Sequence, residues 1–352
     1  MRTILHVLQL MGVGGVQELV YNIVCNLPKD INRVVVFSYK GANDYYINLL
    51  KENNIKLIVS PYNVNDIRNI FVLKKVVDDE QIDIIHVHNT KPQIQCSVLL
   101  ALNKKLKGVV TEHSMTSKRR NYVVFKLIDN FTYSQYDKII SVSKSVQDVL
   151  EPWLSSISRK KFGVIYNGVD INKIHSYAPS PRNAFSLNPD DYLISSVGRL
   201  REGKGFDTII KALKFLPENY KLVIVGDGPL RTSLEELTVN EKVKDRIVFT
   251  GSSNSVPSLL KMTDLYVSAS HTEGFGLTVI EAIVSGLPVI CTRIPAFKEL
   301  LDDDVLFDVG NSEQLASLIL KHKSIDNKKY EDCYCIKSMV EQYNELYQEL
   351  VQ

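Results

Sequence analysis

The chain has 352 residues, of which 45% are hydrophobic and 23% charged, an ordinary composition for a globular protein long enough to form two domains. It contains no run of about 18 or more apolar residues, which argues against a membrane-spanning helix. The net charge of +2 is unevenly distributed: residues 1–176 carry 23 Lys and Arg against 15 Asp and Glu, net +8, and the remainder carries 19 against 25, net −6. The basic half predicts an anionic partner, with an uneven spread of solvated surface charge as the alternative.

The five cysteines are scattered and lack the spacing of a metal-ligand set. We therefore expect free thiols and a reducing, cytoplasmic compartment. Residues 1–11 combine an arginine with an apolar run, but His6 and Gln9 interrupt the run and no small-residue cleavage site follows. A first β-strand leading into a glycine loop is a better interpretation than a signal peptide.

In the first half of the chain, short apolar runs alternate with helix-like segments. We expect strands at residues 3–10, 34–37, 55–59, 82–86, 108–111, 138–143 and 162–165. Helices are expected between them, at residues 16–27, 45–52, 67–79, 93–102 and 144–150. This alternation predicts βαβ units and a parallel sheet, and hence an α/β fold.

The first loop, G-V-G-G at residues 12–15, resembles part of a dinucleotide-binding fingerprint. It lacks the third glycine, and the second strand ends without an acidic residue for a ribose, so a nicotinamide or flavin role is disfavoured. Gly14 and Gly15 favour a loop whose backbone N–H groups approach a diphosphate or an acceptor. A simple tight turn is the alternative.

His113 directly follows the fifth strand, at the edge of a parallel sheet where ligands bind. The next segment, residues 114–136, mixes basic and aromatic side chains, including Lys118 and Tyr133. On an amphipathic helix this mixture suits an anionic membrane surface, and equally suits a solvated helix with core aromatics. No nucleic-acid-binding motif is present.

A polar, proline-containing segment at residues 172–190 is the expected linker to a second α/β region. Strands are expected there at residues 192–198, 222–225, 246–250, 264–268 and 288–292. Helices are expected at residues 206–216, 230–237, 256–260, 277–284 and 313–320. Arg199 and Lys204 lie among glycines after the first of these strands, and such a pair favours a diphosphate ligand.

The stretch from 270 to 286 reads S-H-T-E-G-F-G-L-T-V-I-E-A-I-V-S-G and predicts a strand, a glycine loop and a helix. The start of such a helix offers unpaired N–H groups and partial positive charge to a phosphate. Glu281 lies one turn further in, where it can accept hydrogen bonds from a sugar's hydroxyls. Glu273, before the turn, faces the group attached to the phosphate.

Taken together, these features resemble the retaining GT-B glycosyltransferases of family 4. The matching segments are, in order, the Gly14–Gly15 loop, T-E-H at 111–113, I-S-V-S at 140–143, V-I-Y-N-G-V-D at 164–170, V-G-R-L at 197–200 with Lys204 and Gly205, V-G-D-G-P at 225–229, and E-G-F-G at 273–276 with Glu281. Each is short, but their shared order spans most of the chain. The segment at 294–299, I-P-A-F-K-E, departs from the G-G-x-x-E of many relatives.

The resemblance implies two Rossmann-like domains facing each other across a cleft. Residues 1–175 would bind the acceptor, residues 176–325 the nucleotide-sugar, and residues 326–352 would form a helical segment that crosses back to the first domain. The donor-binding residues implied are Gly15, Arg199, Lys204, Glu273, Gly274, Phe275, Gly276, Leu277, Thr278 and Glu281.

The resemblance also implies which residues promote transfer. Arg199 and Lys204 would neutralise the diphosphate as its charge develops, while His113 and Glu273 would contact the transferred sugar. These charges would replace a metal, so we expect no metal and no cofactor, with same-face attack that retains configuration.

The expected partners are a nucleotide-sugar, most simply a UDP-sugar, a glycan or lipid-linked acceptor, and an anionic membrane surface on its cytoplasmic face. This pattern suits assembly of a bacterial capsular polysaccharide, exopolysaccharide or lipopolysaccharide. Two alternatives share the architecture: a nucleotide-sugar epimerase, and a non-catalytic nucleotide-sugar-binding subunit.

Overall fold

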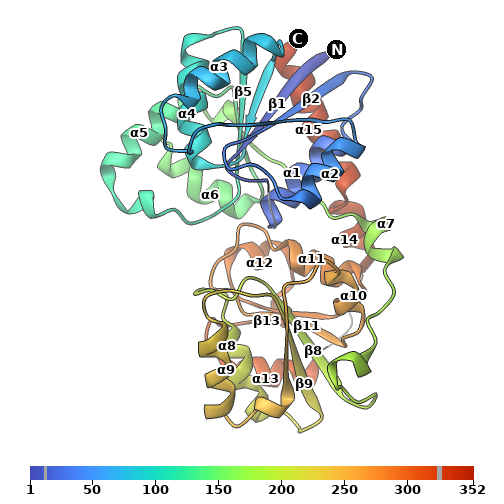
Figure 1. Ribbon diagram of the computed structural model, residues 1–352. Helices are drawn as coiled ribbons and strands as arrows, with labels where there is room; N and C mark the ends of the chain where they lie inside the picture. Colours follow the sequence, from blue (N-terminus) through green and yellow to red (C-terminus); the bar gives the residue numbers. More distant parts are fainter. Residues whose placement is uncertain (12–13, 323–326) are drawn as a thin grey trace. The chain divides into compact units, whose positions relative to one another are not determined.

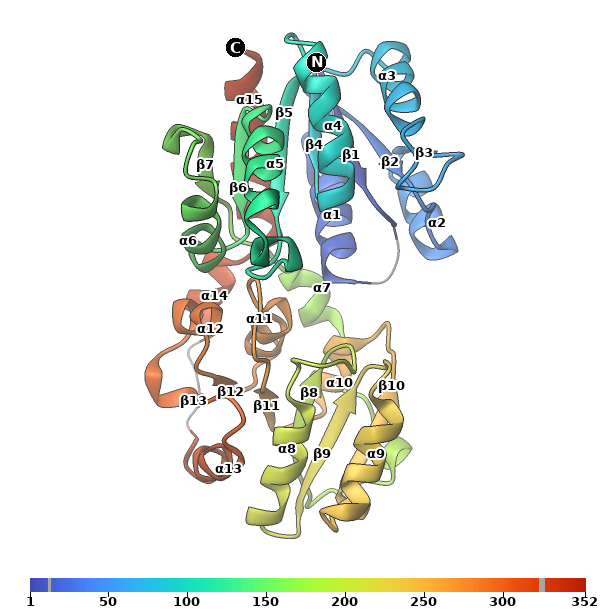
Figure 2. The same ribbon diagram turned by 90° about the vertical axis from the view of Figure 1, so that its left-hand side faces the viewer.

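The computed structural model describes residues 1–11, 14–322 and 327–352 (Figures 1 and 2). The chain forms two compact units. The first comprises Met1–Gly168 together with Ile336–Gln352, and the second is Val169–Cys335. All five cysteines are free thiols, as the sequence indicated.

The first unit is built on a seven-stranded parallel sheet in the order β3-β2-β1-β4-β5-β6-β7. The strands are β1 (Arg2–Leu8), β2 (Asn32–Ser38), β3 (Lys56–Val59), β4 (Ile84–Val87), β5 (Lys107–Glu112), β6 (Lys138–Ser141) and β7 (Phe162–Val164). Strands β1 and β4 at the centre are buried throughout. This is expected where helices cover both faces of a parallel sheet.

Helices cover both faces of this sheet (Figure 1). One face packs against α3 (Asn69–Asp79), α4 (Thr90–Leu102), α5 (Val123–Ser134) and α6 (Lys144–Trp153). The other packs against α1 (Gly15–Asn26), α2 (Asp44–Glu52) and α15 (Ile336–Val351). Two 3-10 turns, η1 (Lys118–Asn121) and η2 (Arg159–Lys161), precede α5 and β7. The last helix of the chain is therefore part of the first core, with Tyr343 and Tyr347 fully buried.

The second unit contains a six-stranded parallel sheet in the order β10-β9-β8-β11-β12-β13. Its strands are β8 (Tyr192–Val197), β9 (Tyr220–Val225), β10 (Ile247–Gly251), β11 (Leu265–Ser268), β12 (Val289–Thr292) and β13 (Leu306–Phe307). Its helices are α7 (Ile171–Ser176), α8 (Phe206–Ala212), α9 (Arg231–Asn240), α10 (Val256–Lys261), α11 (Leu277–Val284), α12 (Pro295–Leu300), α13 (Ser312–Lys321) and α14 (Asn327–Cys333). Single 3-10 turns complete the unit: η3 (Arg182–Phe185), η4 (Leu213–Phe215), η5 (Lys244–Arg246) and η6 (Asp303–Val305).

The two parallel sheets confirm the α/β class that the sequence predicts. Some local expectations differ in detail. The expected linker at 172–190 includes most of α7 and all of η3. Helix α7 forms because the Asp170 side chain caps it by accepting a hydrogen bond from the Lys173 amide. The last expected helix is two helices, α14 in the second unit and α15 in the first. The first unit ends at Gly168 and resumes at Ile336, compared with the expected boundaries at 175 and 326.

Candidate functional site

The candidate site of the second unit lies where neighbouring parallel strands end. Strands β8 and β11 are adjacent in the sheet, so the loops that follow them meet at its carboxyl edge. Lys204, from the loop after β8, forms an ion pair with Glu273, from the loop after β11. Ser270 donates a further hydrogen bond to the same Glu273 Oε1, at 2.8 Å. The structure thus brings together two candidate residues that lie far apart in the sequence.

The Lys204–Glu273 pair is only partly buried, with side chains 19% and 21% exposed. Both groups therefore remain accessible to a ligand while each holds the other in place. An ammonium has three N–H donors, so one bond to Glu273 leaves donors on Lys204 for phosphate oxygens. The sequence predicted both residues but not that they bind each other.

Arg199 is the second residue after β8 and is exposed. Among the residues that the structure describes, none accepts a hydrogen bond from its guanidinium. The loop that carries it is firmly held, because the Leu200 amide donates to Asp227 O at 2.9 Å and the Leu230 amide donates to Leu200 O at 3.0 Å. Arg199 is thus a free cation on a fixed backbone.

Glycines permit the backbones of this edge to touch. At Gly205, where φ is +67°, an added Cβ would lie 2.0 Å from the carbonyl oxygen of Ala269, just after β11. At Gly226 an added Cβ would lie 1.9 Å from the oxygen of Gly198. The loops after β8, β9 and β11 therefore pack backbone against backbone, which fixes the charged residues they carry.

Two glycines of one loop offer a matched test of this close packing. Gly203→Ala meets open space at φ +80°, so we expect it to cost about 1–2 kcal/mol of unfolding free energy. Gly205→Ala adds a clash with a backbone carbonyl, and we expect it to cost about 1–3 kcal/mol more. Urea denaturation of both variants measures the difference. Equal losses for the two variants would contradict the close approach.

Helix α11 begins at this edge, immediately after the glycine loop. Gly276, with φ +108°, precedes its first residue, and an added Cβ there would lie 2.7 Å from the Phe297 ring. The first carbonyl to accept a hydrogen bond within the helix is that of Gly276, which accepts from the Val279 amide at 2.9 Å. The amides of Leu277 and Thr278 lie before this first helical hydrogen bond. The helix thus presents N–H groups and partial positive charge to the loop.

Of the other predicted residues in this stretch, some pack against the core and others are partly exposed. Phe275 is buried and its ring lies 5.4 Å from that of Tyr334, so its side chain anchors the loop. The Thr278 hydroxyl accepts a 2.8 Å bond from buried Tyr266. Gly274 and Glu281 are partly exposed, with Glu281 one turn into α11.

In the first unit, His113 follows β5 at the carboxyl edge of the sheet. Its Nε2 atom is buried, and among the described residues it has no hydrogen-bond partner. Burial lowers the pKa of His113 to about 4, so the imidazole is neutral at physiological pH. A buried, unpaired ring nitrogen costs free energy unless a ligand or water satisfies it.

Sequence reasoning assigned no role to three further histidines near His113: His6 on β1, His86 on β4, and His88 directly after β4. His6 and His86 are paired in the strand register, and the His88 ring lies 5.6 Å from the His113 ring. The signal that could have found them is the H-V-H pattern, which places two histidines on one face of a strand.

The ring nitrogens of His6, His86 and His88 lie within 4.8 Å of one another, a spacing compatible with a metal. Four of these six nitrogens already have a hydrogen-bond partner, whereas His6 Nε2 and His88 Nδ1 have none among the described residues. His86 uses both nitrogens, with Tyr347 Oη at 2.5 Å and Thr111 Oγ1 at 2.7 Å, and His6 Nδ1 lies 3.0 Å from His88 Nε2. With no nitrogen left on His86, the cluster is best described as a hydrogen-bonded polar core that joins the sheet to α15.

This core predicts sensitivity to acid. Burial lowers the pKa of His6 to about 3 and holds the pKa values of His86 and His88 well below the ordinary range. Since these groups bind protons more tightly when unfolded, their stabilising contribution is complete above about pH 6.5 and is lost as the pH falls. We expect the first unit to lose several kcal/mol between about pH 7 and pH 4.

Calorimetric melts across this pH range test the expectation. His88→Asn should make the loss of stability with falling pH shallower, because one buried titrating group is removed. His175→Asn is the matched control, since His175 is about half exposed and lies in the other unit. Identical pH profiles for His88→Asn and the wild type would contradict the prediction.

The first glycine loop lies only partly within the described residues, because Gly12 and Val13 fall outside them. Gly14 immediately precedes α1, and Gly15 is its first residue and is exposed. The Glu18 amide donates the first helical hydrogen bond, to Gly14 O at 3.0 Å, so the amides of residues 15–17 lie before it. This helix start is a second place suited to an anion.

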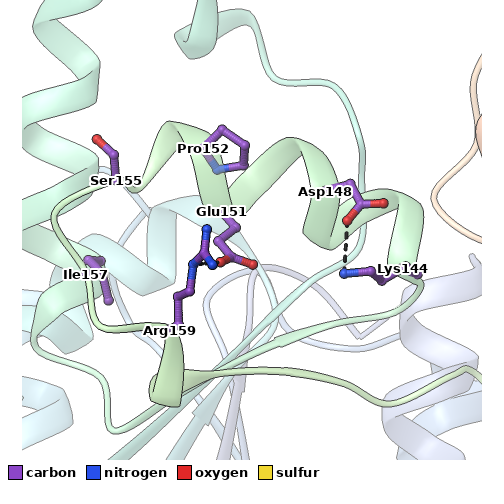
Figure 3. Close-up of a pocket in the computed structure, with 7 residues that line it drawn as sticks. All are labelled: Lys144, Asp148, Glu151, Pro152, Ser155, Ile157 and Arg159. Carbon is purple, nitrogen blue, oxygen red and sulfur yellow. Dashed lines mark ion pairs between the residues drawn. The ribbon is translucent and has the colours of Figure 1, made fainter.

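A surface pocket of about 520 Å³ lies along α6 and is lined by Lys144, Asp148, Glu151, Pro152, Ser155, Ile157 and Arg159 (Figure 3). Its charges are satisfied internally, by the Lys144–Asp148 ion pair at 3.0 Å and the Arg159–Glu151 ion pair at 2.7 Å. With no unpaired charge among these four side chains to attract a ligand, the pocket is a weaker candidate than the two strand edges.

Two protein-family models match the chain, one mainly in each unit. The model for glycosyltransferase family 4 matches residues 13–173. The model for glycosyl transferases group 1 matches residues 180–335.

Within the described part of the chain, no helix is both long enough and apolar enough to cross a membrane.

Two curated relatives and one solved structure extend this result. The O-antigen biosynthesis glycosyltransferase WclY of Escherichia coli is 27% identical, over 77% of this chain and 80% of the relative. The UDP-Gal:alpha-D-GlcNAc-diphosphoundecaprenol alpha-1,3-galactosyltransferase of Escherichia coli is 28% identical, over 66% of this chain and 63% of the relative. Anabaena Alr3699/HepE, solved with UDP and glucose, matches with a TM-score of 0.86 at 21% identity, over 99% of this chain and 100% of that one. The structural likeness confirms the predicted GT-B fold.

Proposed function

Because this chain belongs to the group 1 glycosyltransferases of family 4, we propose that it transfers a sugar from a UDP-sugar to a glycan or lipid-linked acceptor with retention of configuration. The observation that carries the proposal is the edge of the second sheet. There, free Arg199, the Lys204–Glu273 pair and the start of α11 gather on fixed loops. Cations and amide dipoles of this kind suit a diphosphate that gains charge as a sugar leaves it.

The mechanism follows from that charge. When the bond between the anomeric carbon and the phosphate oxygen breaks, its electron pair stays on the diphosphate and the sugar becomes cation-like. Arg199, Lys204 and the Leu277 and Thr278 amides stabilise the leaving diphosphate. Glu273 orients both Lys204 and the sugar, and Glu281 binds the ribose hydroxyls.

We further propose that the acceptor hydroxyl attacks the face that the diphosphate leaves and passes its proton to a phosphate oxygen. No step then needs a protein nucleophile. Because protein cations neutralise the diphosphate, we propose that transfer also needs no metal. His113 and Gly15, on the first unit, contact the transferred sugar and the phosphate or acceptor.

The names of the relatives support the choice of donor and acceptor. WclY is an O-antigen biosynthesis enzyme, and the galactosyltransferase is named for a UDP-galactose donor and a diphosphoundecaprenol-linked acceptor. We propose that this chain likewise adds a sugar to a lipid-linked glycan, at the cytoplasmic face of a membrane, during assembly of a bacterial surface polysaccharide.

Thermal shift with a panel of nucleotide-sugars, followed by transfer assays on polyprenyl-diphosphate-linked sugars, tests the proposal. A donor at about 100 times its dissociation constant should stabilise the fold by about 2.7 kcal/mol. Nuclear magnetic resonance of the product then reports the anomeric configuration, and activity should persist in a chelator. Inversion, or activity lost in chelator and restored by magnesium, would contradict the corresponding part of the mechanism.

Two alternative outcomes identify the competing functions. Conversion of the donor sugar without any acceptor would indicate an epimerase. Donor binding without turnover on any acceptor would indicate a binding subunit. The presence of Arg199, Lys204, Glu273, Glu281 and His113 favours the transferase over the latter.

A further inference from the structure

Two histidines stand at the ends of neighbouring strands in the first sheet. His88 directly follows β4 and His113 directly follows β5, and these two strands pair with each other. The centroids of the two rings lie 5.6 Å apart, and the rings are tilted by 34°. Because ligands bind at the carboxyl ends of parallel strands, both rings lie at the ligand edge of this sheet.

Each ring has one buried nitrogen that is unpaired. Among the described residues, His88 Nδ1 and His113 Nε2 have no hydrogen-bond partner. Such atoms are uncommon in folded proteins, since each costs free energy unless water or a ligand completes its hydrogen bonding. The ring separation of 5.6 Å is comparable with two hydrogen bonds of roughly 2.8 Å placed end to end. One hydroxyl between the rings can therefore bond to both nitrogens.

The chain around His88 holds its ring in place. The His88 amide donates to Val7 O at 3.1 Å, and the next side chain, Asn89, accepts a 2.8 Å bond from the Gln9 amide. The second ring nitrogen of His88, Nε2, lies 3.0 Å from His6 Nδ1. Turning the ring to take Nδ1 elsewhere would break the bond to His6, so the position of Nδ1 is fixed.

The bond to His6 also links the tautomers of the two rings. Burial lowers the pKa of His6 to about 3 and holds the pKa of His88 well below its ordinary value, so each neutral ring carries one N–H. If His6 Nδ1 donates, the proton of His88 must be on Nδ1. If His88 Nε2 donates instead, the proton of His6 must be on its own Nε2, which has no partner among the described residues. An unpaired buried N–H is rarer than an unpaired acceptor, so the first arrangement is favoured and His88 Nδ1 is a donor.

We propose that His88 and His113 hold one hydroxyl between them, with His88 Nδ1–H donating to its oxygen and His113 Nε2 accepting its hydrogen. Because burial lowers the pKa of His113 to about 4, that ring is neutral and its Nε2 can accept. A hydroxyl fits the site because it both donates and accepts. The inference rests on the proposed function: water occupies the site in the free chain, and a sugar hydroxyl replaces it for transfer. His88 then determines specificity, because a sugar without that hydroxyl leaves a buried donor and a buried acceptor unpaired.

Two substitutions separate the two nitrogens of His88. A glutamine amide lies near the Nε2 position and keeps the bond to His6, whereas an asparagine amide lies near the Nδ1 position and keeps the bond to the hydroxyl. We expect His88→Gln to melt close to the wild type but to lose about tenfold in kcat/KM, the value of about one buried hydrogen bond. We expect His88→Asn to melt at a lower temperature but to keep most of its turnover.

Initial rates with the UDP-sugar of largest thermal shift and a polyprenyl-diphosphate-linked sugar compare the two variants. If His88 were merely structural, activity would follow stability, so equal losses or the opposite order would overturn the proposal. The control is Tyr347→Phe, which removes the hydroxyl 2.5 Å from His86 Nδ1 and should lower stability while leaving kcat/KM unchanged. The double variant His88→Gln with His113→Ala should be little slower than His113→Ala alone, because both remove bonds to one hydroxyl.

Nitrogen-15 magnetic resonance of the histidine-labelled full chain tests the polarity of the site without any substrate. We expect a proton on His88 Nδ1 and none on His113 Nε2, and a bare His88 Nδ1 would overturn the proposal. Absence of turnover with every donor contradicts the proposed function. Turnover that His88→Gln leaves unchanged contradicts this inference alone.

Discussion

Lys204→Ala is expected to lower turnover by about 10²-fold or more, while donor affinity falls less. The ammonium lies at the strand edge where, in the proposed mechanism, charge develops on the leaving diphosphate. Loss of one preorganised charge-stabilising group in other enzymes costs on the order of 10²- to 10³-fold. Initial rates at saturating donor measure the effect. The control is Lys211→Ala, because Lys211 is on α8, pairs with Asp207 and is 41% exposed.

The ion pair sharpens this prediction, because Glu273 has two proposed tasks. Glu273→Gln removes the charge that holds Lys204 and, in the proposed mechanism, also weakens the contact with the sugar. If the pair acts as a unit, the double variant Lys204→Ala with Glu273→Gln should be little slower than the slower single variant. Fully additive losses would show that the two side chains act independently. Near wild-type turnover in Lys204→Ala would show that Lys204 has no part in the mechanism.

The sequence predicted the strand edges well, because parallel strands deliver their following loops to one side of a sheet. Arg199, Lys204, Glu273 and His113 each follow a recognisable strand. Their pairing was not predictable in the same way. Lys204 and Glu273 are 69 positions apart, and they meet only because β8 and β11 are neighbours in the sheet. Local sequence patterns do not predict the order of strands in a sheet.

The same limit explains the buried histidines and the orientation of α5. His6 meets His86 through the register of β1 and β4, which depends on the whole sheet. For α5, the pattern of apolar residues predicts a helix but not which side faces the core. The usual expectation places the apolar side inward, whereas the ion pair of Asp129 with Arg119 draws the polar side in.

His113→Ala is expected to lower turnover on the order of 10²-fold, and His113→Gln much less. The reason is that the buried Nε2 has no partner among the described residues, so a substrate hydroxyl can complete its hydrogen bonding. A glutamine amide lies near the Nε2 position and can replace one such bond, whereas alanine cannot. Rates with a fixed donor and acceptor pair compare the variants, and equal losses in both would contradict a hydrogen-bonding role.

The protonation state of His113 supplies an independent test of that role. Because burial lowers its pKa to about 4, His113 is neutral across the working range, and its charge cannot be what the sugar recognises. Turnover of the wild type should therefore show no acid limb from this residue between about pH 6 and pH 8. An apparent pKa near 6.5 that vanishes in His113→Gln would instead mean that the residue acts as a protonated acid. A flat profile, combined with the contrast between the two variants, assigns His113 to orienting the sugar through a neutral imidazole.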